Sequence, residues 1–113
     1  MKGLQNVADA MSLMSDVYYK ATINHLRVFC FIAANNNRVI HTNELPDALG
    51  MTQTTINRSM RSMADRSYIH ETGFKLLRIS IDPTDERQRI VELTPKGKDL
   101  ANRMSEKIYG ETT

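Results

Sequence analysis

The chain has 113 residues, of which 41% are hydrophobic and 25% are charged, and this composition favours one globular domain over a disordered chain. The formal net charge is +2, and the single cysteine excludes an intrachain disulfide framework and a multi-cysteine zinc site. The longest apolar run, from Val28 to Ala34, is too short to cross a bilayer. Asp9 and Asp16 interrupt the N-terminal segment, so we expect no signal peptide and a cytoplasmic protein.

The N-terminal part of the chain is predicted to form two helices. From Leu4 to Tyr19 the apolar residues recur at spacings of three and four, which is typical of a helix with one apolar seam. Thr22 is a suitable N-cap for a second helix over Ile23–Ala34. The later part of that helix is apolar nearly all round, which predicts that it is the buried central element.

The middle of the chain predicts a helix-turn-helix. A short extended piece at 38–41 precedes a short helix over Asn43–Leu49, which Gly50 is expected to end. Thr52 is then a good N-cap for a longer helix over Gln53–Arg66. Two helices separated by about three residues that include a glycine form the helix-turn-helix pattern.

Past this motif, the hydrophobic period changes from helical to alternating. Leu77–Ile81 alternates apolar and polar residues, and the apolar Ile90–Leu93 follows the polar stretch 82–89, so we predict a β-hairpin with a charged tip. Thr94-Pro95 is a cap followed by proline at the first helical position, and it opens a last helix. The predicted fold is therefore mainly α with a small β-hairpin wing, a winged helix-turn-helix.

Two segments resemble a known family. Leu45–Arg58, LPDALGMTQTTINR, is similar to the helix-turn-helix of MarR-type winged-helix regulators. DPTDER at 82–87 and LTPKG at 93–97 resemble their wing and the start of the helix that follows, and this wing signature is the more specific of the two. The segment 70–76 looks like an insertion of the kind found in compact, phage- or plasmid-borne members. The resemblance extends over about residues 23–97 and implies a DNA-binding transcription regulator.

The terminal helices are predicted to form a dimer. The resemblance divides the single domain 1–113 into a DNA-binding core over 22–94 and terminal helices at 1–21 and 95–113, although the family usually has two helices after the wing. The apolar seams of the two terminal helices also indicate a homodimer, because no further helix follows to cover them. The predicted interface residues are Leu4, Val7, Met11, Met14, Tyr18, Leu100, Met104 and Ile108. The alternative is that both seams pack onto the second helix of their own chain.

The polar face of the predicted recognition helix carries the groups that DNA binding requires. No acid occurs from Met51 to Ala64, while amide and guanidinium groups suit base edges and phosphates. Ile56, Met60 and Met63 fall on the opposite, apolar face. The residues of this helix expected to contact DNA are Thr52, Gln53, Thr54, Asn57, Arg58 and Arg61.

The predicted wing adds a second DNA contact. The resemblance implies that Arg87 enters the minor groove and that Asp85 or Asp82 orients it, and Arg89 is included among the DNA-binding residues. The acidic residues of the hairpin tip argue against purely electrostatic binding to phosphates, and they favour the placement of one arginine in a narrow minor groove. The alternative is a hairpin tip with ordinary surface charges.

Catalytic and metal-binding functions find no support in the sequence. Cys30 lies in an apolar run, which predicts a buried, unreactive thiol. His25, His41 and His70 lack the spacing of metal ligands, and no phosphate loop, nucleophile motif or carboxylate pair occurs. We therefore expect no enzyme, no metal and no cofactor.

Two classes of function remain. The first is a sequence-specific regulator that binds double-stranded DNA, with the recognition helix in the major groove and the wing arginine in the minor groove. The second is a winged-helix module that binds a host or partner protein instead of DNA. Arg58, Arg61 and Arg87 favour the first class, whereas the small net charge leaves room for the second. Whether a small-molecule effector exists is left open by the sequence.

Overall fold

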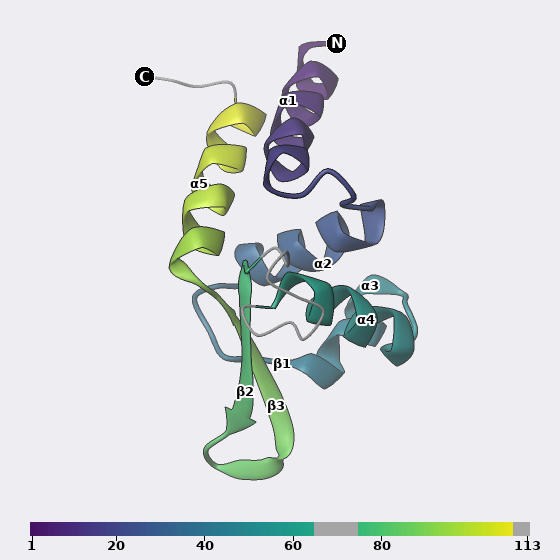
Figure 1. The fold of residues 1–113 in the computed structure, drawn as a ribbon, viewed down its shortest axis with the longest axis vertical. Helices are drawn as coiled ribbons and strands as arrows, with labels where there is room; N and C mark the ends of the chain where they lie inside the picture. Colours follow the sequence, from purple (N-terminus) through teal and green to yellow (C-terminus); the bar gives the residue numbers. More distant parts are fainter. Residues whose placement is uncertain (65–74, 110–113) are drawn as a thin grey trace.

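The computed structural model describes residues 1–64 and 75–109, which form a winged helix-turn-helix (Figure 1). The predicted order of helices and strands is confirmed. The helices are α1 (Lys2–Val17), α2 (Ile23–Ala34), α3 (Leu45–Leu49), α4 (Gln53–Met63) and α5 (Pro95–Tyr109), with a 3-10 turn, η1 (Thr42–Glu44), before α3. The strands are β1 (Ile40–His41), β2 (Leu77–Asp82) and β3 (Asp85–Leu93). Within these ranges no helix is long and apolar enough to span a membrane.

Helix α2 is central, as predicted, and it begins where the sequence indicates. The Thr22 hydroxyl accepts the His25 N–H at 3.3 Å, and His25 Nδ1 accepts the Thr22 N–H at 2.9 Å. The two residues thus form a reciprocal capping box in which both backbone N–H groups have an acceptor. Val28, Phe29 and Ile32 are buried, and the helix contacts α3, α4, α5 and β3. It therefore forms the support on which α4 and the hairpin are assembled.

The prediction that Cys30 is buried is wrong. Only one face of α2 packs into the core, and Cys30 lies on an exposed position of this helix. The surrounding protein atoms nevertheless desolvate the thiolate, which raises the pKa of the Cys30 thiol. A raised pKa disfavours the nucleophilic thiolate, so the thiol is exposed without being activated.

The turn between α3 and α4 has the predicted chemistry. Gly50 ends α3 with a φ of +64°, the left-handed conformation that glycine adopts most easily. The Thr52 hydroxyl then accepts the Thr55 N–H at 3.2 Å and caps α4. Helix α4 ends at Met63, so the predicted helix is too long at Ala64, which has an extended backbone and forms an isolated bridge to Leu77 of β2. Residues 65 and 66 of the predicted helix and residues 70–74 of the predicted insertion lie outside the described residues.

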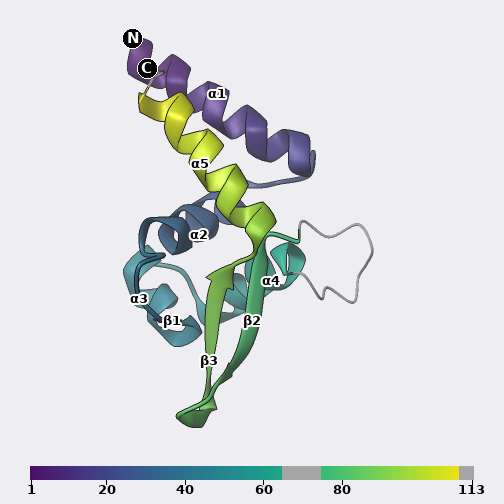
Figure 2. The same ribbon diagram turned by 90° about the vertical axis from the view of Figure 1, so that its left-hand side faces the viewer.

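The described strands form a three-stranded antiparallel sheet in the order β1-β3-β2. The predicted alternation fails at the far end of β2, where Asp82 is buried and Ile81 is 54% exposed. The cause is a shift of register between these two residues, because Ile81 pairs with Arg89 whereas Asp82 pairs with Asp85. The turn is therefore only Pro83-Thr84, shorter than the predicted charged tip, and the hairpin projects away from the helices (Figure 2).

Thr94 joins the sheet to α5 and confirms the predicted cap. Its hydroxyl accepts the Gly97 N–H at 3.0 Å and donates to the Lys75 carbonyl at 2.8 Å. Its backbone N–H donates to the Leu76 carbonyl at 3.0 Å, while the Leu76 N–H donates to the Met63 carbonyl at 2.8 Å. This junction fixes the start of α5 against the end of α4.

The terminal helices pack against each other within one chain. Helices α1 and α5 lie side by side and antiparallel, on the opposite side of the molecule from the hairpin tip (Figures 1 and 2). The Asn6 amide donates to the Ile108 carbonyl at 3.2 Å across this contact. The expectation that nothing in the chain covers the two seams is therefore corrected, because Met14, Leu100 and Met104 are buried here. Tyr18 is half-buried, whereas Leu4, Val7, Met11 and Ile108 stay exposed.

Candidate nucleic-acid interface

Helix α4 separates an apolar face from a basic one. Ile56, Met60 and Met63 are buried against the core. The opposite face carries exposed Thr54, Arg58 and Arg61 and half-buried Asn57. The predicted DNA-contact residues of this helix are thus accessible to solvent, and the two arginines lie three residues apart, on one side of the helix.

Side-chain hydrogen bonds order the first turns of α4. Gln53 Nε2 donates to Asn57 Oδ1 at 2.9 Å, so these two amides hold each other at helical spacing. The Thr52 hydroxyl serves as the cap and donates to Thr55 Oγ1 at 3.1 Å. Thr52 therefore has a structural role at this end, and the Gln53–Asn57 amide pair is the ordered polar group next to it.

His25 supports α4 from α2, a role that the sequence did not reveal. His25 Nδ1 accepts a backbone N–H, which assigns the ring proton to Nε2, and Nε2 lies 2.7 Å from Ser62 Oγ on α4. Burial lowers the pKa of His25, which favours this neutral form. Only the spacing Thr22–His25 at a helix start could have indicated this ring as part of a cap.

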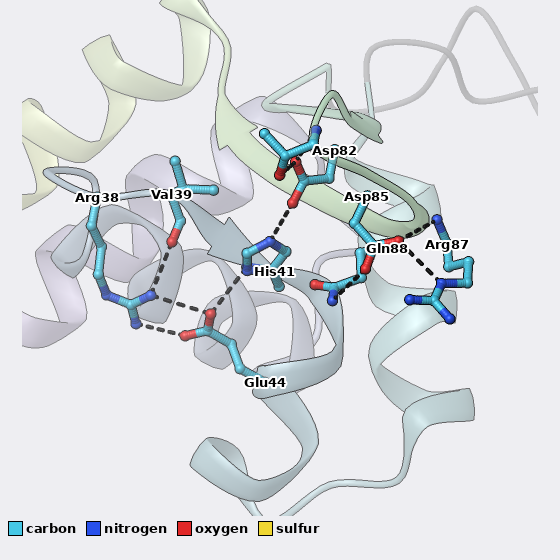
Figure 3. Close-up of polar contacts among 9 residues, drawn as sticks. Arg38, Val39, His41, Glu44, Asp82, Asp85, Arg87 and Gln88 are labelled. Carbon is cyan, nitrogen blue, oxygen red and sulfur yellow. Dashed lines mark hydrogen bonds and ion pairs between the residues drawn. The ribbon is translucent and has the colours of Figure 1, made fainter.

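At the wing, Arg87 is tethered to Asp85 (Figure 3). Asp85 Oδ1 accepts the Arg87 backbone N–H at 3.1 Å and Arg87 Nε at 3.2 Å, and Asp85 Oδ2 accepts Gln88 Nε2 at 3.2 Å. These hydrogen bonds, those from Arg87 foremost, lower the pKa of Asp85 and keep it ionised. The Arg87 side chain is nevertheless 90% exposed, so its far end projects into solvent from a fixed base.

Asp82, the other candidate for orienting Arg87, has different partners. Its Oδ1 accepts the Thr84 N–H and the Thr84 hydroxyl, each at 2.8 Å, and its Oδ2 lies 2.7 Å from His41 Nε2. The structure therefore brings Asp85, and not Asp82, to Arg87. Arg89 lies exposed on β3, next to the tip.

The described part of the chain gives no geometric support for metal binding. Across 1–64 and 75–109, no three His, Cys, Asp or Glu side chains converge in a way that could hold a metal ion.

The sequence matches no family model and no curated protein. The structure is similar to that of an S. aureus MepR–DNA complex, with a TM-score of 0.70 and 18% identity over 95% of this chain and 77% of that one. It is also similar to a mutant of S. aureus MepR, with a TM-score of 0.71 and 19% identity over 90% of this chain and 66% of that one. RV1404 from Mycobacterium tuberculosis gives a TM-score of 0.68 and 22% identity over 94% of this chain and 66% of that one.

These solved structures are MarR-type winged-helix regulators, so the predicted resemblance is confirmed at the level of the fold. The present chain spans 61% to 77% of the length of the MepR structures that it matches. At identities of 18% to 22%, the likeness establishes the architecture shared with them.

Proposed function

We propose that the protein is a sequence-specific regulator that binds double-stranded DNA, with α4 in the major groove and Arg87 in the minor groove. The observation that carries the proposal is the geometry of Arg87, whose side chain is 90% exposed while Asp85 holds its Nε. An arginine fixed at its base and open at its end suits insertion into a narrow groove of negative potential.

Two further observations support this function. The exposed face of α4 presents Arg58 and Arg61 without a carboxylate between Met51 and Ala64 to repel phosphates. One of the similar structures is a MepR–DNA complex. Another is that of BpsR from Bordetella bronchiseptica, whose DNA binding is regulated by 6-hydroxynicotinic acid.

A salt titration separates DNA binding from the alternative of a protein-interaction module. Fluorescence anisotropy with labelled random-sequence duplex DNA is measured from low to moderate salt. Counterion release predicts that the logarithm of the affinity falls linearly with the logarithm of the salt concentration, by about 10-fold or more between 50 and 200 mM. Absence of binding at the lowest salt would favour the protein-interaction module.

The wing arginine gives a prediction about groove width. Arg87→Ala should lower DNA affinity by about 1–2 kcal/mol on sites with A·T-rich flanks and by less on G·C-rich flanks, because A-tracts narrow the minor groove. Asp85→Ala should produce a milder form of the same defect, since Arg87 then keeps its charge but loses the acceptor of its Nε. Both are measured by competition between duplexes that differ only in their flanks.

Arg87→Lys is the matched control, because it keeps the charge but lacks the guanidinium group that Asp85 holds. We expect it to lose the preference for A·T-rich flanks while retaining part of the affinity. If Arg87→Ala lowered the affinity equally on both kinds of flank, Arg87 would be a phosphate contact and not a minor-groove contact.

We further propose that the protein acts as a homodimer through the part of the α1–α5 pair that stays exposed. Leu4, Val7 and Met11 on α1 and Ile108 on α5 are between 39% and 64% exposed, although all four are large and apolar. A two-fold contact through this patch would present two recognition helices to half-sites about 34–36 Å apart.

Sedimentation equilibrium at micromolar concentration checks the dimer. We expect a dimer mass for the wild type and a monomer mass for Met11→Asp and Ile108→Asp, with DNA affinity reduced in both. Met104 is unsuitable for this test because it is buried within its own chain. Ile23→Asp is the control, since Ile23 is an exposed apolar residue of α2, a helix that contributes nothing to the patch. A monomer mass for the wild type would contradict the dimer.

A further inference from the structure

We infer that His41, which lies outside both the recognition helix and the hairpin, positions the wing by holding the turn at its tip to the segment that leads into the helix-turn-helix. The inference rests on the proposed DNA-binding function. It assigns His41 the role of a positioning residue, which touches no DNA itself.

His41 reaches across the sheet. Strand β1 lies at the edge opposite β2, and within the sheet His41 pairs with Ile90, which in turn pairs with Ser80. The imidazole therefore crosses the central strand, and Nε2 donates to Asp82 Oδ2 at 2.7 Å (Figure 3). The two side chains are only 31% and 11% exposed, which protects the hydrogen bond from water.

Asp82 is the junction through which His41 acts on the tip. Besides His41, it accepts the Thr84 N–H and hydroxyl at 2.8 Å and so fixes the two-residue turn. The register then steps from Asp82–Asp85 to Ile81–Arg89, so Arg87 lies in the bulge that this step creates. A displacement of Asp82 therefore also displaces its paired residue Asp85, on which the orientation of Arg87 depends.

The other end of the connection is fixed as well. The His41 backbone N–H donates to Glu44 Oε2 at 3.0 Å, and Arg38 holds the same carboxylate with hydrogen bonds of 2.6 and 3.2 Å (Figure 3). Glu44 is the last residue of η1 and directly precedes α3. A continuous set of hydrogen bonds thus joins the entrance of the helix-turn-helix to the wing turn.

The hairpin needs such a connection because it projects beyond the rest of the sheet (Figure 2). Strand β1 pairs with β3 only at Ile40 and His41, so beyond this point the wing is a two-stranded hairpin, which is weakly stable by itself. His41 is the last residue of β1 and hence the last backbone tie before the tip. Its side chain carries this support closer to the tip, because it reaches Asp82, which lies beyond the last residue pair between β1 and β3.

The test compares His41→Ala and His41→Gln with the wild type, first in the absence of DNA. For His41→Ala we expect amide hydrogen exchange at Thr84 and Arg87 to accelerate about tenfold, because a hydrogen bond to a charged group is removed. The pKa of Asp82, which is held at about 2 chiefly by the His41 hydrogen bond, should rise toward its ordinary value of 3.8. His41→Gln retains a side-chain N–H donor, so we expect both the faster exchange and the rise in the pKa of Asp82 to be smaller than in His41→Ala. Asn43→Ala, an exposed change in η1, is the matched control.

Duplexes with A·T-rich and G·C-rich flanks are then titrated with the same variants. His41→Ala should lose about tenfold in affinity for A·T-rich flanks, and it should add nothing in a background that already carries Arg87→Ala. Unchanged exchange at Thr84 and Arg87 in His41→Ala would overturn the inference. The inference would also be overturned if His41→Ala lowered the affinity equally in the wild-type protein and in the Arg87→Ala variant. Failure of the proposed function is a separate result, in which the wild type itself binds neither duplex.

Discussion

Replacing Arg58 and Arg61 by alanine is expected to lower the affinity for duplex DNA by about 1–3 kcal/mol each, with loss of base discrimination wherever an arginine contacts a base edge. Both side chains are exposed on the face of α4 that lies opposite its buried residues, so their removal leaves no cavity. In the double variant we expect a loss at or somewhat below the sum, because the two residues are neighbours on one helix face. Circular dichroism and thermal unfolding should match the wild type.

Two comparisons make this prediction specific. Arg103→Ala removes the same charge from α5, where Arg103 is 54% exposed and pairs only loosely with Asp99 at 3.8 Å, and it should leave DNA affinity nearly unchanged. Titration against cognate and scrambled duplexes then distinguishes base contacts from phosphate contacts, since a phosphate contact weakens both alike. Unchanged affinity in the double variant would show that the basic face of α4 does not contact DNA.

Gly97→Ala is expected to destabilise the protein by about 3 kcal/mol, because the added methyl group has no room in the folded chain. A Cβ at Gly97 would lie 2.3 Å from the Leu76 carbonyl oxygen, so the backbone at one of these positions must shift. The same carbonyl accepts the Thr94 N–H, and the Leu76 N–H binds the end of α4 at Met63. The shift therefore strains the junction that fixes α4 relative to α5.

Urea unfolding measures this effect, and Gly3→Ala provides a control of opposite sign. Gly3 lies in α1, and a Cβ added there would meet no heavy atom within 4 Å beyond its own turn of the helix. Alanine at this position should therefore raise the free energy of unfolding by about 0.5 kcal/mol through its better helix propensity. Equal stability of Gly97→Ala and the wild type would show that Leu76 can move away without cost.

The elements with strong local signals were predictable from the sequence. The Thr22 cap and the asparagines after Ala34 set the bounds of α2 as observed, and Thr52 set the start of α4. Helical periodicity likewise identified the buried and exposed faces of α4. These features depend on residues a few positions apart, which a sequence displays directly.

The features that depend on distant residues were not predictable. The hydrogen bond from His41 to Asp82 joins residues 41 positions apart, and it requires a register shift that reverses the burial of Ile81 and Asp82. The sequence left the choice between Asp82 and Asp85 open for the same reason. Cys30 was misjudged because its run of apolar neighbours is wider than the face that α2 buries.

Dimethyl sulfate footprinting on a duplex selected from random sequence tests the central claim most directly, because the reagent reports guanine N7 in the major groove and adenine N3 in the minor groove. We expect protection in the major groove within the site and in the minor groove at its flank. The major-groove protection should be lost in the Arg58 and Arg61 variants, and the minor-groove protection in Arg87→Ala. Absence of protection in both grooves at saturating wild-type protein would contradict the account.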